Sequence, residues 1–294
     1  MSYIISHIIG GLGNQMFQFA AGYALSKQWN MPFKLDISDF SSYGLHNGFE
    51  LPKVFPCQIQ IATHKEIEAL IGYQSTNQSF NKLKLKSSIL FGSKCIMLEK
   101  VNYKKNLLLN PRFPLYLKGY WQNQIYFNDF SQDIRRAFLF SKDLTGQNIQ
   151  IANSILNTNS ISLHVRRGDY ATNPKTMAHQ GLIPTAYFRL AIDYIANKVN
   201  KPNFFIFSDD IEWARLNIDI DYPTQFINHN NGENSFYDMQ LMSKCCHHII
   251  ANSSFSWWGA WLNPSRQKIV IGPKKWFANT RRLNNPCPPE WILI

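Results

Sequence analysis

The sequence predicts an α/β fold of two Rossmann-like domains, because short apolar runs alternate with helical patterns along the whole chain. Strands separated by single helices form parallel sheets with right-handed crossovers. A chain of 294 residues suits two domains, each of about 100–200 residues. The pattern breaks near residues 141–158, so we divide the chain into domains at 1–145 and 146–294. We expect the domains to face a cleft, with ligands beyond the carboxyl ends of the strands.

In the first half, the apolar run at 3–9 predicts a buried strand that enters the glycine-rich turn Gly10–Gly13. Apolar residues at helical spacing predict a helix over 14–29. The remaining elements expected here are strands at 33–36 and 115–120 and helices at 64–72 and 129–138. The rest of 37–110 is expected to form long loops.

The second half has a clearer alternation of strands and helices. Strands are expected at 160–165, 204–207, 224–227, 248–251 and 268–271. Helices are expected at 185–198, 211–217, 235–244 and 256–262. Trp257, Trp258 and Trp261 have helical spacing in the last of these helices and are expected to lie in the core.

Composition excludes a disordered chain, since 45% of the residues are hydrophobic and 17% are charged. The net charge of +11 indicates an anionic partner: nucleic acid, acidic lipid or a phosphorylated substrate. Lysines gather between residues 82 and 105, where we expect a solvated loop, with an anionic membrane contact as the alternative.

Cysteine spacing and hydropathy indicate where in the cell the protein lies. The five cysteines lie in no CxxC pattern, which argues against a disulfide framework and a zinc site. No run of about 18 apolar residues is present. We therefore expect a cytoplasmic protein, with the inner face of the cell membrane as a more specific location.

Two adjacent arginines follow the strand expected at 160–165, within the segment HVRRGDY that runs from His164 to Tyr170. Successive side chains on a strand point to opposite faces. A guanidinium fork suits a diphosphate and keeps its charge at any working pH. We expect Arg166 to meet a ligand and Arg167 to be partly structural, braced by Asp169. The alternative is that both arginines pair with structural acids.

Polar residues also follow two neighbouring strands. Ser208 and Asp209 come after the strand at 204–207, and Asn252, Ser253 and Ser254 come after the strand at 248–251. Hydroxyls and free backbone N–H groups at a helix start suit a phosphate. The alternatives are structural: the segment 207–210 would supply a helix N-cap and a surface acid, and Ser254 or Ser256 would cap the helix after 248–251.

Several weaker patterns suggest other chemistry. The turn from Gly11 gives only part of a GxGxxG fingerprint, because Met16 stands at the third glycine position, although Asp36 lies at a suitable distance. A nicotinamide-dependent oxidoreductase is therefore kept as an alternative. The triplet 219–221 has the DxD form of a metal site, and His247–His248 adjoins a cysteine pair. Both are expected to be structural or surface features, and no metal site is expected.

Three blocks of the sequence, HVRRGDY, IIGGLGNQMFQFAAGYALS and CCHHIIANSSFSWWGAWLN, resemble the signature of the α-1,2-fucosyltransferase family. The resemblance covers nearly the whole chain, and the blocks stand in the family's order. It implies a GT-B-type glycosyltransferase in which the domain at 1–145 serves the acceptor and the domain at 146–294 binds GDP-fucose. It also implies that neither a metal nor another cofactor is required.

The resemblance assigns roles to individual residues. Arg166 matches the arginine that contacts the β-phosphate and stabilises the departing GDP, and Asp238 matches an acid that accepts hydrogen bonds from guanine. The implied donor contacts are His164, Arg166, Arg167, Ser208, Asp209, Asp238, Asn252, Ser253 and Ser254. The implied cleft loop contains Gly11, Gly13, Asn14 and Gln15.

The general base is the least determined of these roles. The glutamate of the related α-1,6 family is replaced by Pro174. Asp169 is the candidate catalytic base, with His179 and Asp36 as alternatives.

The implied reaction transfers L-fucose from GDP-β-L-fucose to the 2-hydroxyl of a terminal β-galactoside, with inversion. The acceptor would be a galactose-terminated oligosaccharide or glycolipid of O-antigen or lipopolysaccharide biosynthesis. A nucleic-acid-binding protein is the second alternative, but the basic residues gather in one stretch instead of along a surface motif, so no nucleic acid is expected.

Overall fold

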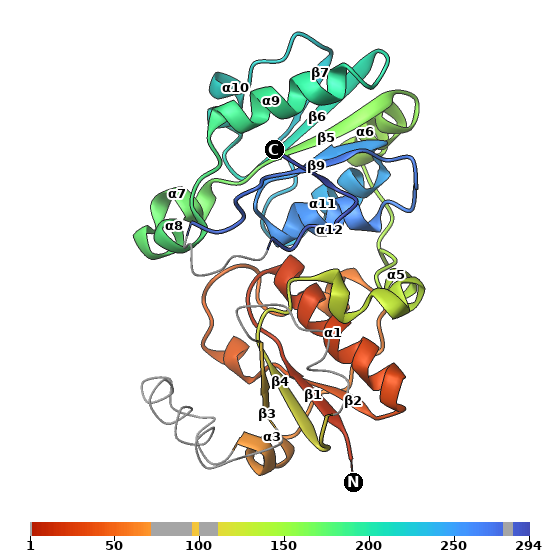
Figure 1. Ribbon diagram of the computed structural model, residues 1–294, viewed down its shortest axis with the longest axis vertical. Helices are drawn as coiled ribbons and strands as arrows, with labels where there is room; N and C mark the ends of the chain where they lie inside the picture. The colour runs from red at the N-terminus through yellow and green to blue at the C-terminus, as the bar shows by residue number, and fades with distance from the viewer. Residues whose placement is uncertain (1, 72–95, 100–110, 279–284) are drawn as a thin grey trace. The chain divides into compact units, whose positions relative to one another are not determined.

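The computed structural model describes residues 2–71, 96–99, 111–278 and 285–294. The chain forms two compact units, Met1–Ser141 and Lys142–Ile294 (Figure 1). The division falls at residue 141, close to the boundary expected at 145. Most of the basic stretch at 82–105 lies outside the described residues.

The first unit contains a parallel sheet with the strand order β2-β1-β4-β3. Its strands are β1 (Ile4–His7), β2 (Phe33–Asp36), β3 (Ile96–Leu98) and β4 (Leu115–Lys118). The bounds of β2 are those predicted, and β1 and β4 are shorter than predicted. Strand β3 falls where only loops were expected.

Helix α1 (Leu12–Trp29) covers one face of this sheet and α3 (His64–Ile71) the other. Gly22 of α1 allows close packing, since a Cβ there would lie 2.4 Å from the Ser6 hydroxyl of β1. Ile67 of α3 packs with Ile5, whose side chain faces away from α1. The shorter helices of this unit are η1 (Ser38–Ser41), α2 (Leu51–Val54), η4 (Gln124–Tyr126), η5 (Asn128–Phe130) and α5 (Ser131–Ala137).

The second unit contains a six-stranded sheet in the order β10-β9-β8-β5-β6-β7, and each pairing in it is parallel. Its strands are β5 (Asn159–Val165), β6 (Pro202–Ser208), β7 (Thr224–Ile227), β8 (His247–Ile249), β9 (Val270–Gly272) and β10 (Ile292–Leu293). The α/β class and the parallel sheets predicted from the sequence are confirmed.

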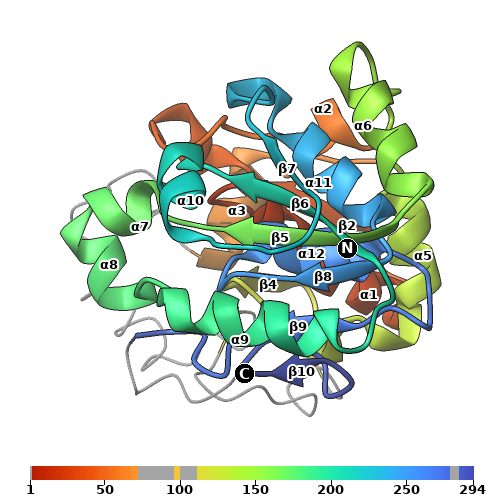
Figure 2. The same cartoon turned by 90° about the horizontal axis from the view of Figure 1, so that it is seen from above.

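Helices cover both faces of this sheet, and successive residues of β6 show the alternation. Phe204 and Ile206 pack toward α9, whereas Phe205 and Phe207 pack toward α6 and α11. Figure 2 shows α9 and α11 on opposite sides of β5. Burial of both faces is what a parallel sheet requires. The helices are α6 (Gln147–Leu156), α9 (Thr185–Ala196), α10 (Ile211–Asn217), α11 (Phe236–Lys244) and α12 (Ser254–Leu262).

Two short helices, α7 (Gly168–Thr172) and α8 (Pro174–Gln180), lie between the strand expected at 160–165 and the helix expected at 185–198, where no helix was predicted. The Asn173 side chain accepts hydrogen bonds from the backbone N–H groups of Lys175 and Thr176, and Pro174 occupies the first helical position. Asparagine followed by proline is a helix-start signal that the sequence does contain. The tryptophans of α12 are buried, as predicted.

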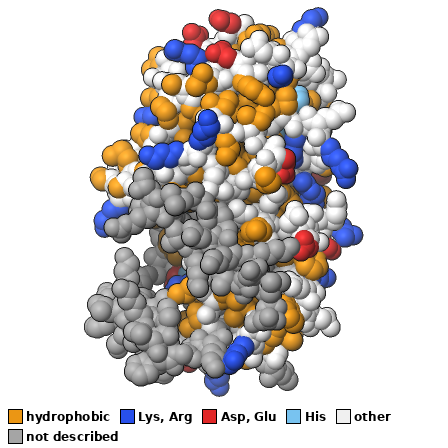
Figure 3. All heavy atoms as spheres, viewed as in Figure 1, with side chains coloured by type: hydrophobic (Ala, Val, Ile, Leu, Met, Phe, Trp, Pro, Cys, Tyr) orange, Lys and Arg blue, Asp and Glu red, His pale blue; other side chains and the backbone are white. Residues whose placement is uncertain are grey.

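Within the described residues, no helix is both long enough and apolar enough to cross a membrane. On the face shown in Figure 3, the lysines and arginines of the described residues lie scattered among apolar and neutral side chains.

Candidate active site

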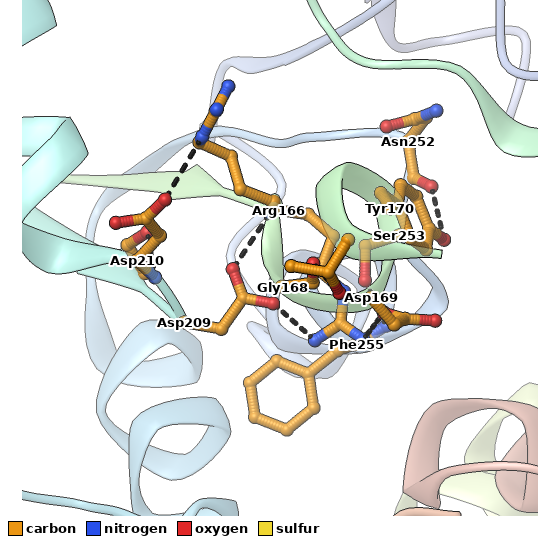
Figure 4. A network of polar contacts seen from close by, with 12 residues as sticks. Arg166, Gly168, Asp169, Tyr170, Asp209, Asp210, Asn252, Ser253 and Phe255 are labelled. Carbon is orange, nitrogen blue, oxygen red and sulfur yellow. Dashed lines mark hydrogen bonds and ion pairs between the residues drawn. The ribbon is translucent and has the colours of Figure 1, made fainter. Parts of the chain in front are cut away.

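Three polar loops of the second unit meet at the carboxyl ends of the neighbouring strands β8, β5 and β6 (Figure 4). Val165 at the end of β5 lies opposite Ser208 at the end of β6. Leu163 of β5 lies opposite Ile249 at the end of β8. The residues that follow these strands therefore share one edge of the sheet, where parallel α/β folds bind ligands.

Arg166 is held by two carboxylates. One terminal nitrogen lies 2.8 Å from Asp209 Oδ2, and the other donates to Asp169 Oδ1 at 2.5 Å. Its guanidinium also lies over the Tyr170 ring, 5.3 Å from the centroid. Burial lowers the pKa of Arg166, whereas Asp209, Asp169 and Tyr170 raise it. The raising effects together are larger, so the pKa of Arg166 lies above its ordinary value. The charge is permanent and fixed in position.

Arg167 points to the other side and packs on helix α10. Its Nε donates to Asp210 Oδ2 at 3.2 Å, and its guanidinium carbon lies 4.0 Å from the centre of the Trp213 ring. The expectation that Asp169 braces Arg167 is wrong. Alternation along the strand directs Arg166 toward Asp169 of α7 and Arg167 toward the acid at the start of α10.

Asp209 contacts both Arg166 and Arg167. Its Oδ1 accepts a hydrogen bond from the backbone N–H of Arg167 at 2.8 Å, while Oδ2 faces Arg166. A Cβ on Gly168 would lie 2.4 Å from Asp209 Oδ2, so glycine is needed for this close approach. The side chain of Asp209 is committed to the arginine loop in this structure.

The neighbours of Asp209 organise the next loop. The Ser208 hydroxyl accepts from the backbone N–H of Asp210 at 3.0 Å, and Asp210 Oδ1 accepts from the backbone N–H of Trp213 at 3.2 Å. Asp210 is therefore the N-cap of α10, so the helix cap that the alternative placed in the segment 207–210 is present. Asp210 was missed as a site residue, although an acid directly before a helical pattern is a capping signal.

His164 is buried on β5, two residues before Arg166. Burial and the neighbouring charge of Arg166 lower the pKa of His164 to about 3. Its ring lies 5.9 Å from that of Phe255. Among the described residues, its buried Nδ1 has no hydrogen-bond partner. His164 therefore brings an uncharged polar ring to this edge of the sheet.

The segment after β8 is occupied by structural hydrogen bonds. The Asn252 amide donates to the carbonyls of Gln180, Gly181 and Trp276 at 3.0–3.3 Å. The Ser253 hydroxyl accepts from the backbone N–H of Phe255 at 3.3 Å and caps α12. The caps considered from sequence, Ser254 and Ser256, are wrong because α12 begins at Ser254 and both residues lie within it. The cap leaves the positive end of the α12 dipole at the same edge as Arg166.

Asp238 belongs to a second polar group, on α11 after the end of β7. Its Oδ1 accepts from the Asn230 amide at 2.7 Å, and Asn230 bonds in turn to Asn148 of α6 at 2.9 Å. Burial raises the pKa of Asp238 to about 7, and the bond from Asn230 opposes that rise. This carboxyl changes its charge near neutral pH.

The glycine turn of the first unit has a mainly structural arrangement. Gln15 is fully buried; it donates to the carbonyls of Gly10 and Gly48 at 2.8 Å and accepts from the backbone N–H of Glu50 at 2.9 Å. The prediction that Gln15 donates hydrogen bonds into a cleft is therefore wrong, because its side-chain amide bonds the backbone of residues 10, 48 and 50 instead. Asn14 Oδ1 accepts from Gln122 at 2.7 Å.

The glycines of this turn differ in their backbone requirements. Gly10 has a φ of +90°, which favours glycine. Gly11 has a φ of −73° as the N-cap of α1, and Gly13 lies within that helix. Among the glycines of this turn, the left-handed conformation therefore falls at Gly10.

Asp36 is also committed within the first unit. It is 2% exposed and accepts hydrogen bonds from the Tyr116 hydroxyl at 2.6 Å and the backbone N–H of Ser38 at 3.0 Å. It therefore offers neither a free ribose contact for a nicotinamide nucleotide nor an accessible base.

The patterns that suggested a metal are otherwise explained. Asp219 and Asp221 are exposed. His247 Nδ1 accepts from the backbone N–H of Ile269, and His248 lies between Ser162 and Asn263, both within 2.9 Å of its ring nitrogens. In the part of the chain that the structure describes, no group of three or more His, Cys, Asp or Glu is placed to hold a metal ion.

Comparison with known proteins gives full-length relatives. The chain is 36% identical to an α-1,2-colitosyltransferase of Escherichia coli over 100% of its own length and 99% of the relative. It is 35% identical to the O-antigen biosynthesis glycosyltransferase WbnK of Escherichia coli, over 98% of this chain and 99% of the relative.

The fold is also similar to a solved structure. Fucosyltransferase NodZ from Bradyrhizobium superposes with a TM-score of 0.52 at 12% identity, covering 90% of this chain and 94% of NodZ. The similarity supports the GT-B-type fold class. The profile of Glycosyl transferase family 11 matches residues 97–294, which is more than half of the chain. The chain therefore belongs to glycosyl transferase family 11 and is a glycosyltransferase.

Proposed function

We propose that the enzyme transfers L-fucose from GDP-β-L-fucose to the 2-hydroxyl of a terminal β-galactoside, with inversion at the anomeric carbon. The observation that carries the proposal is the fixed guanidinium of Arg166 at the carboxyl edge of the second sheet. The α-1,2 linkage named for the colitosyltransferase and the soaking of NodZ, an α-1,6-fucosyltransferase, with GDP-fucose agree with it.

The unused N–H donors of Arg166, and not the net charge of the cluster, explain how this edge accepts a diphosphate. The cluster holds two arginines and three acids, Asp169, Asp209 and Asp210, so its formal charge is 2 − 3 = −1. Bare charge therefore does not attract the ligand. A guanidinium carries more N–H donors than the two contacts of Arg166 use.

Arg166 acts on the leaving group. The acceptor oxygen forms a bond to the anomeric carbon, the carbon–oxygen bond to the β-phosphate breaks, and its electron pair stays on GDP. A fixed cation stabilises that growing charge without reorganising. The dipole of the α12 N-terminus adds to it. These groups do the work that a divalent metal does in other transferases, so no metal is required.

The remaining donor contacts recognise the nucleotide and shape its site. The ionised carboxylate of Asp238 accepts hydrogen bonds from the guanine ring N–H and amino group. His164 offers an uncharged ring nitrogen beneath the phosphates, and the hydroxyls of Ser208 and Ser254 line the same edge. Asp209 holds the arginine loop, and Asn252 and Ser253 hold the segment after β8.

The base role predicted for Asp169 stays a prediction. Its Oδ1 already bonds Arg166, so the residue has two possible contributions that experiment can separate. As a base, Asp169 would take the proton of the acceptor hydroxyl, and D169N would remove a limb of the pH–rate profile. As a holder of Arg166, it would leave the profile unchanged and alter the donor KM.

The second candidate donor is GDP-colitose, because a 36% identical relative carries the colitosyltransferase name. The acceptor in either case is a galactose-terminated oligosaccharide or glycolipid of O-antigen assembly, held by the first unit. Contact with the inner face of the membrane would bring the enzyme to a glycolipid acceptor. The nicotinamide and nucleic-acid alternatives have no support from the relatives or from the site.

The direct experiment supplies the purified enzyme with GDP-fucose or GDP-colitose, with lactose and other β-galactosides as acceptors, in EDTA. We expect release of GDP and an α-1,2-linked product, identified by NMR. Loss of transfer in EDTA that Mn²⁺ restores would contradict the metal-independent mechanism. Absence of product from every donor and acceptor, with no GDP binding, would contradict the proposal as a whole.

A further inference from the structure

The carboxyl edge of the first sheet carries a polar pair that the donor site does not use. His7 ends β1, and its Nε2 lies 2.9 Å from Asp39 Oδ2. The His7 side chain is 8% exposed, whereas that of Asp39 is 38% exposed. The buried imidazole therefore fixes a carboxylate that still reaches solvent.

The surroundings of this pair hold His7 in place. The Tyr116 ring stacks near His7, with centroids 6.4 Å apart and planes at 27°. The Tyr116 hydroxyl is bonded to Asp36, which lies opposite His7 in the sheet register. The bond from His7 lowers the pKa of Asp39, as do the charges of His7 and Lys118, against the opposing effect of burial. Asp39 is an anion at neutral pH.

Aromatic residues accompany Asp39 in the segment from Ser38 to Phe49, here called the 38–49 loop. Phe40 lies 5.8 Å from both Tyr43 and Phe49, and Tyr43 lies 6.2 Å from His46 (centroid distances). Phe40 and Tyr43 are half-buried. The loop thus carries a group of contacting aromatic rings that begins at Phe40, the residue directly after the fixed carboxylate of Asp39.

The glycine turn and Gln15 hold this loop against the sheet edge. Gln15 bonds the carbonyl of Gly48 and the backbone N–H of Glu50. A Cβ on Gly11 would lie 3.4 Å from the His46 ring. The loop is therefore attached to the point where β1 enters α1, beyond the carboxyl ends of β1 and β2.

The chemistry of this arrangement matches a neutral sugar. A carboxylate accepts charge-assisted hydrogen bonds from a pair of hydroxyls. Aromatic side chains with a few placed polar groups are the usual lining of small-molecule sites. A phosphate would be repelled by Asp39. Asp36, which also lies at this edge, accepts hydrogen bonds from Tyr116 and Ser38. His7 and Asp39 therefore do not gain a third side chain from Asp36 for a metal site.

We infer that Asp39, fixed by His7, together with Phe40 and Tyr43 of the 38–49 loop, binds the acceptor galactoside. The inference rests on the proposed function, because it names the residues of the first unit that contact the acceptor. Asp39 accepts hydrogen bonds from two sugar hydroxyls, and the aromatic rings cover the C–H face of the sugar.

The test measures steady-state kinetics of D39N and F40L, with S41A as the matched control. Ser41 lies on the same loop and is exposed, with its hydroxyl bonded to the Ser38 carbonyl. We expect the KM for lactose to rise about tenfold or more in D39N and F40L. The KM for GDP-fucose, and its slow hydrolysis without acceptor, should stay within about twofold of wild type in all three variants.

Saturation-transfer NMR with methyl β-D-galactoside, which carries no nucleotide, gives an independent readout. We expect transfer to the galactoside in wild type and S41A, and its loss in D39N and F40L. Unchanged lactose KM and unchanged saturation transfer in F40L would overturn the inference, even if D39N were to misfold. Failure of the wild type to hydrolyse GDP-fucose or bind GDP would instead contradict the proposed function.

Discussion

Arg166 is already fixed before any donor binds, because Asp169 and Asp209 hold its two terminal nitrogens and Tyr170 supports its face. A cation that need not reorganise contributes most to a transition state in which charge develops. The same contacts make the residue intolerant of change. Lysine keeps the positive charge but lacks the planar guanidinium whose two terminal nitrogens bond the carboxylates of Asp169 and Asp209.

We expect R166A and R166K to lower the rate of fucosyl transfer by about a hundredfold or more, which corresponds to roughly 3 kcal/mol of barrier. The exposed Arg189 on α9 offers a matched control, and R189A should transfer at the wild-type rate. Initial rates of GDP release with saturating lactose measure the effect. An R166A rate within about threefold of wild type would remove Arg166 from the chemical step.

The raised pKa of Asp238 predicts a stability that depends on pH. The folded state keeps this proton up to about pH 7, whereas the unfolded chain loses it near the ordinary aspartate pKa of 3.8. The folded state therefore binds more protons between those values, and the free energy of unfolding falls as pH rises, by roughly 1 kcal/mol per pH unit from this group. Denaturant melts of wild type and D238N between pH 4.5 and about 7.5 measure it. Equal slopes for the two proteins would show that Asp238 titrates normally.

The same carboxyl predicts a pH-dependent affinity for the guanine base. Only the ionised form accepts both guanine donors, so binding of guanosine, which carries no phosphate, should tighten as pH rises through about 7. Calorimetric titration with guanosine at several pH values tests this in wild type and D238N. We expect the variant to bind weakly at every pH. A wild-type affinity that does not change with pH would place the base away from Asp238.

At the scale of elements, helices and strands with a regular spacing of apolar residues could be predicted from the sequence. The bounds of β2, β7 and α10 match the predictions, because each has a clear strand or helix pattern between breakers. Helix α6 was not predicted, because its polar sequence QNIQIANSIL was interpreted as part of the boundary between the two domains. Its apolar face is nevertheless present, since Ile151 and Ile155 are buried. Strands β3 and β10 are very short and only half-buried, so no period shows in them.

The candidate site shows the same division between local and long-range information. The edge that carries Arg166 follows from strand order and could be predicted. The pairing of Arg167 with Asp210, of Asn252 with three carbonyls and of Gln15 with the 38–49 loop depends on contacts between distant segments. No local spacing encodes such contacts.

The close approach of α7 to the loop after β6 predicts the effect of G168A. The added Cβ would lie 2.4 Å from Asp209 Oδ2, which is the end of a side chain and can move. We expect GDP affinity to fall about tenfold because Arg166 loses Asp209, one of its two carboxylate partners, with the melting temperature little changed. Gly44, where a Cβ would meet nothing within 4 Å, provides the control G44A. Full GDP affinity in G168A would show that Asp209 does not need its present position.

At the scale of the whole molecule, each unit has its own parallel sheet and its own candidate ligand edge. The second unit also has an open depression of about 1320 Å³ at the opposite end of its sheet, lined by Asn159, Lys201 and Pro223 among others. An open depression of this kind is an alternative place for the donor to bind. The arginine pair and the strand-end rule favour the carboxyl edge instead.

Hydrogen–deuterium exchange with and without GDP decides between these two ends of one sheet. We expect GDP to protect the backbone amides of 166–170, 208–210 and 253–256 and to leave 157–159 and 198–203 unchanged, and we expect R166A to lose that protection. Protection confined to the amino end, or protection that R166A retains in full, would contradict the account that Arg166 grips the donor phosphates.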